Sequence, residues 1–278
     1  MSVTLIQAIL LGVVQGLTEF LPVSSTAHLA LAQHYMPGFS QPGILFDVLL
    51  HVGTLAAVTL FFRQRIVSTA RGIFSADDVE RRASRRLAGL LLLSVALTGA
   101  VTLPLKKLAV EGMSDFRRIG FALIGTAVLL LIAQVVGKRR GDGGQPLGEM
   151  KVRSAALVGI CQSASAVLHG FSRSGNTISV GLFSGMSREA AAEYSFLLSI
   201  PTILAAALVE NWHAYRHNPE TFSTPGAIPV YLVGMFVAAV IGYFAVGALL
   251  RLVVKMHLLP FAIYCAALGL FLAVAPPL

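Results

Sequence analysis

Two polar clusters with the residue types of phosphate chemistry lie inside long apolar stretches of this sequence. The first, over residues 15–28, places the carboxylate of Glu19 and the imidazole of His28 around three hydroxyl groups. The second, over residues 169–177, has Arg173 between two serines. An ionisable residue at membrane depth is costly and is therefore a functional-site hypothesis by default. Because a guanidinium group is a planar fork of donors that suits phosphate, the clusters together predict a phosphate site with acid–base groups.

The first cluster offers several ways to attack phosphorus. Ser25 is the candidate nucleophile, or the group that positions a water molecule. His28 follows three residues later, so on a helical turn the two side chains share a face and the imidazole can take the serine proton. Direct attack by His28, giving a phosphohistidine, is a competing scheme, and a water activated by Glu19 is a third. Glu19 is either a general acid–base or a ligand to Mg²⁺ or Ca²⁺, and Gln15 offers a second, uncharged metal-ligand oxygen.

Hydroxyl and amide side chains in both clusters can donate hydrogen bonds to phosphate, and Gly170 and Gly175 let the backbone approach it closely. Each serine taken alone is equally well explained as a helix cap. Their gathering around one arginine favours phosphate binding. The predicted phosphate-binding residues are Ser24, Thr26, Ser172, Arg173, Ser174, Asn176 and Thr177.

Four further polar residues carry two interpretations of equal weight. Asp47 and His51 lie near the end of an apolar segment, where they either support the site from behind or cap a helix. Glu193 and Ser195 occupy the corresponding region of the second half of the chain and have the same two interpretations.

The composition is that of a polytopic membrane protein. Of the 278 residues, 56% are hydrophobic and 12% are charged, whereas soluble domains carry about 25% charged residues. The net charge of +8 is concentrated in particular loops, so the positive-inside rule explains it better than nucleic-acid binding, which is not expected. Cys161 and Cys265 lie in apolar segments, and their spacing indicates neither a disulfide framework nor a metal site.

Charge-poor stretches predict an all-α membrane fold with about six transmembrane helices. Two other apolar stretches, 3–36 and 154–186, are interrupted by Pro22 or by Gly170 and the polar cluster. Interrupted segments of this kind predict re-entrant helical hairpins that line a cavity, and two ordinary spans each is the alternative. The predicted spans cover roughly residues 44–62, 87–104, 119–136, 190–209, 228–250 and 258–276.

The distribution of Lys and Arg predicts the orientation of these spans. Loop 63–86 holds seven arginines against three acidic residues, and loop 137–153 holds five basic residues, so both are predicted to be cytoplasmic. Loop 210–227 and both termini are then predicted to face outward. Alternation of the spans also places loop 105–118 outside, although it carries four basic residues.

An internal repeat divides the single membrane domain, residues 1–278, into halves of about 1–137 and 150–278. A shift of 147 residues (162 minus 15) or 148 residues aligns several positions, and the order of elements also agrees, with a broken hairpin followed by three spans. The predicted topology makes this an inverted repeat, so the two hairpins should meet near the midplane. Glu19, Ser25 and His28 are then expected to face Ser172, Arg173 and Thr177. The aligned pairs include Gly12 with Gly159, Gln15 with Gln162, Ser25 with Ser172 and Thr54 with Thr202.

The two clusters also resemble the signatures of a known family. The stretch Gln15–His28 (QGLTEFLPVSSTAH) is similar to the first signature of the BacA/UppP family of undecaprenyl-diphosphate phosphatases, and Gly170–Thr177 (GFSRSGNT) resembles the second. Similarity continues through 46–54 and 185–201 and spans the whole chain. The resemblance implies a multi-pass enzyme of the bacterial cytoplasmic (inner) membrane, with its active site open to the outer, periplasmic side. There it would hydrolyse undecaprenyl diphosphate to the monophosphate, recycling the lipid carrier for peptidoglycan synthesis and conferring bacitracin resistance.

The resemblance also implies partners. These are a polyprenyl diphosphate substrate, membrane lipids and bacitracin, which acts by sequestering the substrate, while a homodimer is left open. Three positions depart from the family pattern: Gln15 stands where Glu is usual, Ala27 where Gly is common and His169 where Pro is normal. The first departure removes a carboxylate from any divalent-cation site, and the last adds a titratable group near the phosphate site.

The rival function is a transporter or flippase for polyprenyl phosphate, because inverted repeats and paired hairpins are transporter architecture. A carrier needs binding groups but no nucleophile. Ser25 and His28 beside Arg173 therefore favour hydrolysis. A membrane scaffold without a small-molecule site would leave the intramembrane charges unexplained.

Overall fold

The structure is a computed structural model that describes residues 3–40, 45–105, 115–141, 143–217, 227–255 and 257–277. These residues form helices and no β-strand, apart from one isolated bridge between Gln145 and Met186. The predicted all-α fold is confirmed. Within the predicted outer loops 105–118 and 210–227, residues 106–114 and 218–226 lie outside the described residues.

The helices follow one another with short connections. In chain order they are α1 (Leu5–Thr18), α2 (Ser25–Tyr35), α3 (Leu45–Phe61), α4 (Arg63–Gly72), α5 (Asp78–Thr102), the 3-10 turn η1 (Leu103–Leu105), α7 (Phe116–Arg140), the 3-10 turn η2 (Leu147–Glu149), α8 (Val152–Val167), α9 (Arg173–Phe183), α10 (Arg188–His217), α11 (Ala227–Val254) and α12 (Leu259–Val274).

Every predicted span coincides with a helix, but fewer than six of the described helices have the full length of a span. By length and composition four can cross a membrane, namely α5 with η1, α7, α10 and α11. A fifth span results if α3 and α4 are counted as one, although the chain bends by 69° between them. Helix α12 has 16 residues, below the roughly 20 that a bilayer requires. The chain is a multi-pass membrane protein in which some predicted spans are short or bent.

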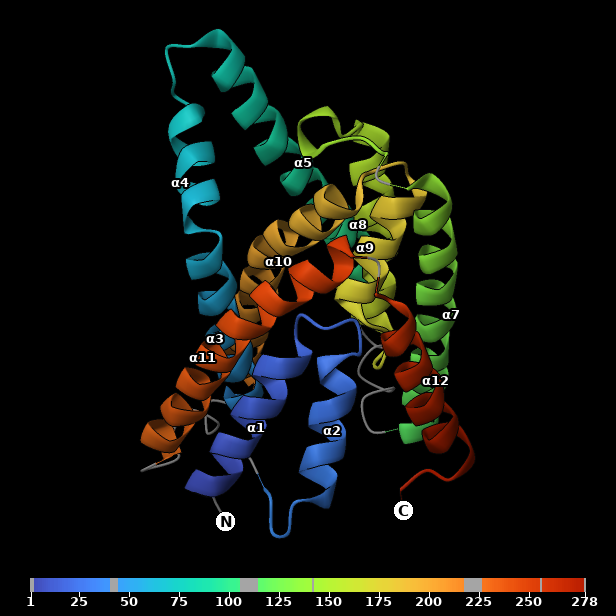
Figure 1. The fold of residues 1–278 in the computed structure, drawn as a ribbon. Coiled ribbons are helices and arrows are strands. Elements are labelled where there is room, and N and C mark those ends of the chain that lie inside the picture. Colours follow the sequence, from blue (N-terminus) through green and yellow to red (C-terminus); the bar gives the residue numbers. More distant parts are fainter. Residues whose placement is uncertain are drawn as a thin grey trace.

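The arginine-rich connections gather at one end of the molecule. Figure 1 shows the α4–α5 connection and the segment between α7 and α8 at the end opposite to both termini. Helix α5 begins at Asp78, where the side chain of Asp77 accepts hydrogen bonds from the first-turn amides. Its charged residues end at Arg86, and an uncharged stretch follows from Leu87. This change marks the level at which the helix passes from a polar to an apolar surrounding.

The two interrupted segments form helical hairpins. Helix α1 ends at Thr18, and Pro22, which has no N–H to donate, lies in the connection to α2. Helix α2 begins after Ser24, whose hydroxyl accepts from the Ala27 amide at 3.4 Å. In the second hairpin Ser172 caps α9 in the same way. Figure 1 shows α1–α2 extending from the end with both termini and α8–α9 from the opposite end, with their tips meeting inside the bundle.

The first helix of each hairpin packs against a long helix of the other half of the chain. Helix α1 lies against α11 and α8 against α5. Both contacts need a glycine, since a Cβ on Gly12 would lie 2.5 Å from the Gly234 carbonyl oxygen and one on Gly159 would lie 2.6 Å from that of Ser94. The same close approach therefore occurs in both halves.

A polar contact also recurs in the two halves. The side-chain amide of Gln15 donates to the Thr54 hydroxyl at 3.4 Å, and that of Gln162 donates to the Thr202 hydroxyl at 3.3 Å. The sequence repeat aligns Gln15 with Gln162 and Thr54 with Thr202, so corresponding residues make the same contact in both halves. The division of the domain at about 137–150 stays a prediction.

Candidate active site

The carboxylate of Glu19 lies at the centre of the polar cluster between the hairpin tips. Its side chain is 4% exposed, and both oxygens accept hydrogen bonds. Oε1 accepts from the Arg173 guanidinium group at 2.6 Å. Oε2 accepts from the Ser25 hydroxyl at 2.6 Å and from the Gln15 amide at 3.0 Å. The expected proximity of Glu19 and Arg173 is confirmed.

The two hairpins position these groups in an equivalent way. Ser25 is the first residue of α2 and Arg173 is the first residue of α9, so each begins the second helix of its hairpin. Both helix N-termini carry positive partial charge and meet at the carboxylate. Such ends favour the binding of anions, including phosphate.

Further contacts hold the tips together. The Ser174 hydroxyl donates to the Leu21 carbonyl at 3.1 Å. A Cβ on Gly175 would lie 3.2 Å from Cβ of Pro22, so the turns of the two hairpins are in van der Waals contact. Gly170, with φ of 98°, allows the second turn to approach α7, where a Cβ would meet the Ile119 carbonyl at 2.6 Å.

The expected pairing of Ser25 with His28 is wrong. His28 Nδ1 donates to the backbone carbonyl of Ser24 at 2.7 Å, and Nε2 lies 2.6 Å from the hydroxyl of Tyr264, with the two rings stacked. Both ring nitrogens are therefore engaged elsewhere. Ser25 is buried and its hydroxyl faces Glu19, whereas the His28 ring reaches Tyr264 on α12, although the helical spacing alone would place the two side chains on one face.

His51 lies next to the Glu19 carboxylate. Its Nε2 lies 3.6 Å from Glu19 Oε2, and its Nδ1 donates to the Asp47 carbonyl at 2.8 Å. His51 therefore lies beside Oε2 of the carboxylate, whereas Arg173 contacts Oε1. The Asp47 side chain does not face the site in this way, since it accepts from the Gln33 amide at 2.6 Å.

The residues after Arg173 are mostly committed to the scaffold. Asn176 donates to the Cys161 carbonyl and to the Ser165 hydroxyl, tying α9 to α8. The Thr177 hydroxyl lies 2.6 Å from that of Ser195 on α10. Both side chains are buried, so these two predicted phosphate ligands hold the second hairpin in place.

Ser172 and Ser24, at the tips of the two hairpins, cap the helices that follow them and contact neighbouring hydroxyl groups. The Ser172 hydroxyl accepts from the Gly175 amide at 3.2 Å and lies 3.3 Å from the Ser174 hydroxyl. In the first hairpin the Ser24 hydroxyl lies 3.0 Å from that of Thr26, which is exposed. Of the predicted phosphate donors outside Arg173, Thr26 is therefore the most accessible.

Ser24 has an unusual backbone. Its φ is 69°, and among the described residues it is the sole non-glycine with positive φ. A non-glycine residue in such a conformation is strained and is typical of functional sites. The strain is local to the turn that presents the Ser25 hydroxyl to Glu19.

A divalent cation would have few protein ligands here. The described residues contain no cluster of three or more His, Cys, Asp or Glu side chains that could hold a metal ion. Gln15 turns its NH₂ group to Glu19, and its carbonyl oxygen is buried without a hydrogen-bond partner. That oxygen and Glu19 fit a cation whose remaining ligands are phosphate oxygens and water.

The sequence does not indicate that Tyr264 contacts the site region, and it assigns no role to His169. Tyr264 lies on the apolar helix α12, and no local pattern distinguishes it from a lipid-facing aromatic residue. His169 lies in the α8–α9 turn, with Nδ1 buried and without a hydrogen-bond partner in the described part of the chain.

The chemistry of the site follows from these contacts. A hydroxyl that donates to a buried carboxylate can lose its proton to it as it attacks. A guanidinium group uses one donor on the same carboxylate and keeps others for an anionic substrate. The arrangement combines a nucleophile, a base and a positive charge, as displacement at phosphorus requires.

Comparison with known proteins gives matches over nearly the whole chain. The family model described as bacitracin resistance protein BacA matches residues 8–271. The undecaprenyl-diphosphatase of Syntrophotalea carbinolica is 40% identical over 273 residues, which is 97% of this chain and 98% of the relative. The undecaprenyl-diphosphatase of Treponema denticola is 38% identical over 276 residues, 98% of this chain and 97% of the relative.

Proposed function

The chain belongs to the bacitracin resistance protein BacA family, and on this premise we propose that it is a phosphatase that hydrolyses undecaprenyl diphosphate to undecaprenyl phosphate and inorganic phosphate. The names of its relatives support the activity and the substrate. The observation that carries the proposal is the Ser25 hydroxyl, 2.6 Å from a carboxylate that Arg173 also contacts.

In the proposed reaction Ser25 is the nucleophile. Its Oγ attacks the terminal phosphorus as its proton moves to Glu19 Oε2. The bond from phosphorus to the bridging oxygen breaks, and that oxygen leaves with the lipid monophosphate and receives the proton from Glu19. A phosphoserine remains, and the displacement requires the attacking and leaving oxygens to be in line.

Hydrolysis of the phosphoserine completes the cycle. Glu19 takes a proton from the attacking water, inorganic phosphate departs, and the proton returns to Ser25 Oγ. Arg173 and the two helix N-termini stabilise the negative charge of the transferring group in both steps. Glu19 thus acts as the base twice, which is the role that sequence reasoning had divided between Glu19 and His28.

The divalent cation, Mg²⁺ or Ca²⁺, is part of the proposal. Gln15 and Glu19 would hold it, and when bound it would supply further neutralisation of phosphate charge. Arg173 already provides a fixed positive charge at the carboxylate.

The cellular setting is also proposed from the family. The site would open to the outer side of the bacterial cytoplasmic membrane, where hydrolysis recycles the lipid carrier for peptidoglycan synthesis. Bacitracin sequesters the diphosphate substrate, so faster removal of that substrate would confer resistance. The arginine-rich end, which lies opposite the termini (Figure 1), supports this orientation through the positive-inside rule. A homodimer is left as an open proposal.

A transporter or flippase for polyprenyl phosphate is the second candidate, supported by two hairpins that enter from opposite ends and meet at an anion-binding point. Release of inorganic phosphate from purified protein with a polyprenyl diphosphate separates the two. The phosphatase proposal requires multiple turnovers. Binding of the monophosphate without phosphate release under any cation condition would favour the carrier.

A further inference from the structure

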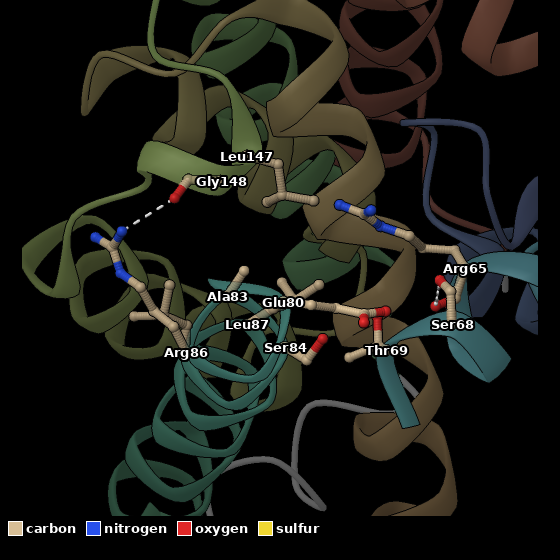
Figure 2. A pocket seen from close by; sticks show the side chains of 11 residues that line it. Arg65, Ser68, Thr69, Glu80, Ala83, Ser84, Arg86, Leu87, Leu147 and Gly148 are labelled. Atoms are coloured by element: carbon tan, nitrogen blue, oxygen red, sulfur yellow. Dashed lines mark hydrogen bonds between the residues drawn. The ribbon is translucent and has the colours of Figure 1, made fainter. Parts of the chain in front are cut away.

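A cavity lined by both polar and apolar side chains lies outside the active site, at the arginine-rich end of the molecule. It has a volume of about 300 Å³ and lies between α4, α5 and the turn η2. Figure 2 shows η2 on one side of it, the first turns of α5 on the other, and Arg65 of α4 reaching across. At about 30 Å³ for each water molecule, this space would hold a polar group of roughly ten heavy atoms.

Arg65 is held in position to bind an anion. Its Nε donates to the Glu193 carboxylate at 3.0 Å, and this ion pair fixes the direction of the guanidinium plane. The two Nη groups remain for a ligand in the cavity. Figure 2 shows the guanidinium group directed toward Leu147, over the cavity.

Two hydroxyl groups lie on the same cavity. Thr69 on α4 and Ser84 on α5 both line it, and within the described residues neither hydroxyl has a hydrogen-bond partner. Arg86, in contrast, closes one side, since its Nη groups donate to the carbonyls of Gly148 and Met150 at 3.0 and 2.8 Å. Arg65 with the two hydroxyls therefore forms a set of donors that suits a phosphate group.

A carboxylate on the cavity sets a further condition on the ligand. Glu80 lines the same space and accepts from the Ser75 hydroxyl at 2.6 Å. A phosphate dianion would be repelled by it. A ligand with a phosphate at one end and a cationic hydrogen-bond donor at the other would match Arg65 and Glu80 together.

The cavity lies at the level where α5 changes from charged to uncharged residues. Its lining includes Leu87, Leu90 and Leu147, and Leu87 begins the uncharged stretch of the membrane-spanning helix α5. Basic pockets between helices at this level are typical headgroup sites. The apolar lining suits the first carbons of a lipid and gives no advantage to free phosphate.

We propose that this cavity binds a phospholipid through an ethanolamine phosphate headgroup, with the phosphate on Arg65 and the two hydroxyls and the ammonium group on Glu80. The site is distinct from the active site and does not depend on the proposed hydrolysis. Phosphatidylcholine is the matched competitor, because it has the same charges but no N–H donor for Glu80.

Lipid binding to the purified, delipidated full-length protein, measured by native mass spectrometry, tests this proposal. Phosphatidylethanolamine should bind roughly tenfold more tightly than phosphatidylcholine, as expected for one charge-assisted hydrogen bond. Glu80→Gln should abolish that preference, whereas Glu149→Gln, the same change on an exposed residue outside the lining, should keep it. Equal binding of the two lipids to the wild type would overturn the proposal.

A second set of variants tests the proposed contacts with the lipid phosphate. Arg65→Gln should weaken the binding of both lipids, whereas Arg71→Gln on the same helix should not. Because Arg65→Gln also leaves Glu193 unpaired, Thr69→Val combined with Ser84→Ala tests the same end without breaking an ion pair and should weaken both lipids too. Unchanged binding in this double variant would contradict the placement of the phosphate, and displacement of the lipid by millimolar inorganic phosphate would identify free phosphate as the ligand.

Discussion

The Arg173 guanidinium group lies 2.6 Å from the Glu19 carboxylate, although 154 positions separate the two residues in the chain. Each comes from the tip of a different helical hairpin, so this ion pair joins the two halves of the molecule at the candidate active site. Because Glu19 is almost fully buried, removing Arg173 would leave a buried charge unpaired, which typically costs about 3–5 kcal/mol. The pair therefore holds the site together and also gives it positive charge for the substrate.

Arg173→Lys should impair phosphate release severely while the protein still folds. Lysine keeps the charge but cannot contact Glu19 and a phosphate at once with a planar fork. The expected loss is roughly 30- to 1000-fold in kcat/KM, equivalent to about 2–4 kcal/mol of transition-state stabilisation. Arg82→Lys, on an exposed residue of α5, is the matched control. Turnover near the wild-type value in Arg173→Lys would remove Arg173 from the site.

The sequence predicted this pair through topology and not through local pattern. Opposite entry of the two hairpins was enough to place Glu19 near Arg173. The direction of individual side chains was not predictable in the same way. The wrong pairing of Ser25 with His28 assumed that helical spacing decides contacts, whereas burial of Ser25 against a carboxylate decided them.

Disulfide crosslinking tests the contact of the hairpin tips. With Cys161 and Cys265 replaced by alanine, cysteines at Pro22 and Gly175 should crosslink, because a Cβ on Gly175 would be 3.2 Å from Cβ of Pro22, close to the roughly 3.5–4.5 Å of disulfides. A cysteine at Gly99, where nothing lies within 4 Å of an added Cβ, is the control partner for Pro22→Cys. Failure of the 22–175 pair to crosslink in folded protein would contradict the contact between the two hairpin tips.

Gln15→Glu should make hydrolysis more dependent on a divalent cation. The change places a second carboxylate where an amide now donates to Glu19 at 3.0 Å, so repulsion lowers activity without metal and a cation is bound more tightly. Titration of Mg²⁺ after chelation should give a lower half-maximal concentration than in the wild type. An identical metal titration would show that position 15 is not a ligand.

Replacement of His28 should be milder than replacement of Glu19. His28 contacts Ser24 and Tyr264 but not the Ser25 hydroxyl, so His28→Ala should retain measurable turnover, whereas Glu19→Gln should lose roughly 10²–10⁴-fold, the usual contribution of a general base. Tyr264→Phe combined with His28→Ala should cost little more than His28→Ala alone, because the two side chains act through one contact. Equal, complete loss in His28→Ala and Glu19→Gln would restore His28 as the base.

Tyr264 also shows where sequence reasoning had no signal. It lies on α12, more than two hundred positions from His28, among residues that face lipid or core. The roles of Asn176 and Thr177 were equally hidden, because a side chain that holds a hairpin and one that binds phosphate look alike in sequence. Such distinctions depend on the packing of α8, α9 and α10 against one another.

The most direct test of the account is phosphate release by purified wild-type protein and by Ser25→Ala, each with undecaprenyl diphosphate and with lipid binding measured in parallel. The wild type should release inorganic phosphate over many turnovers. Ser25→Ala should bind the lipid but release no phosphate above background, and Ser184→Ala, which removes a hydroxyl that donates only to backbone carbonyls of α9, should behave as the wild type. Normal hydrolysis by Ser25→Ala would contradict the serine mechanism in favour of a water activated by Glu19, and a wild type that binds the lipid without releasing phosphate would contradict hydrolysis itself.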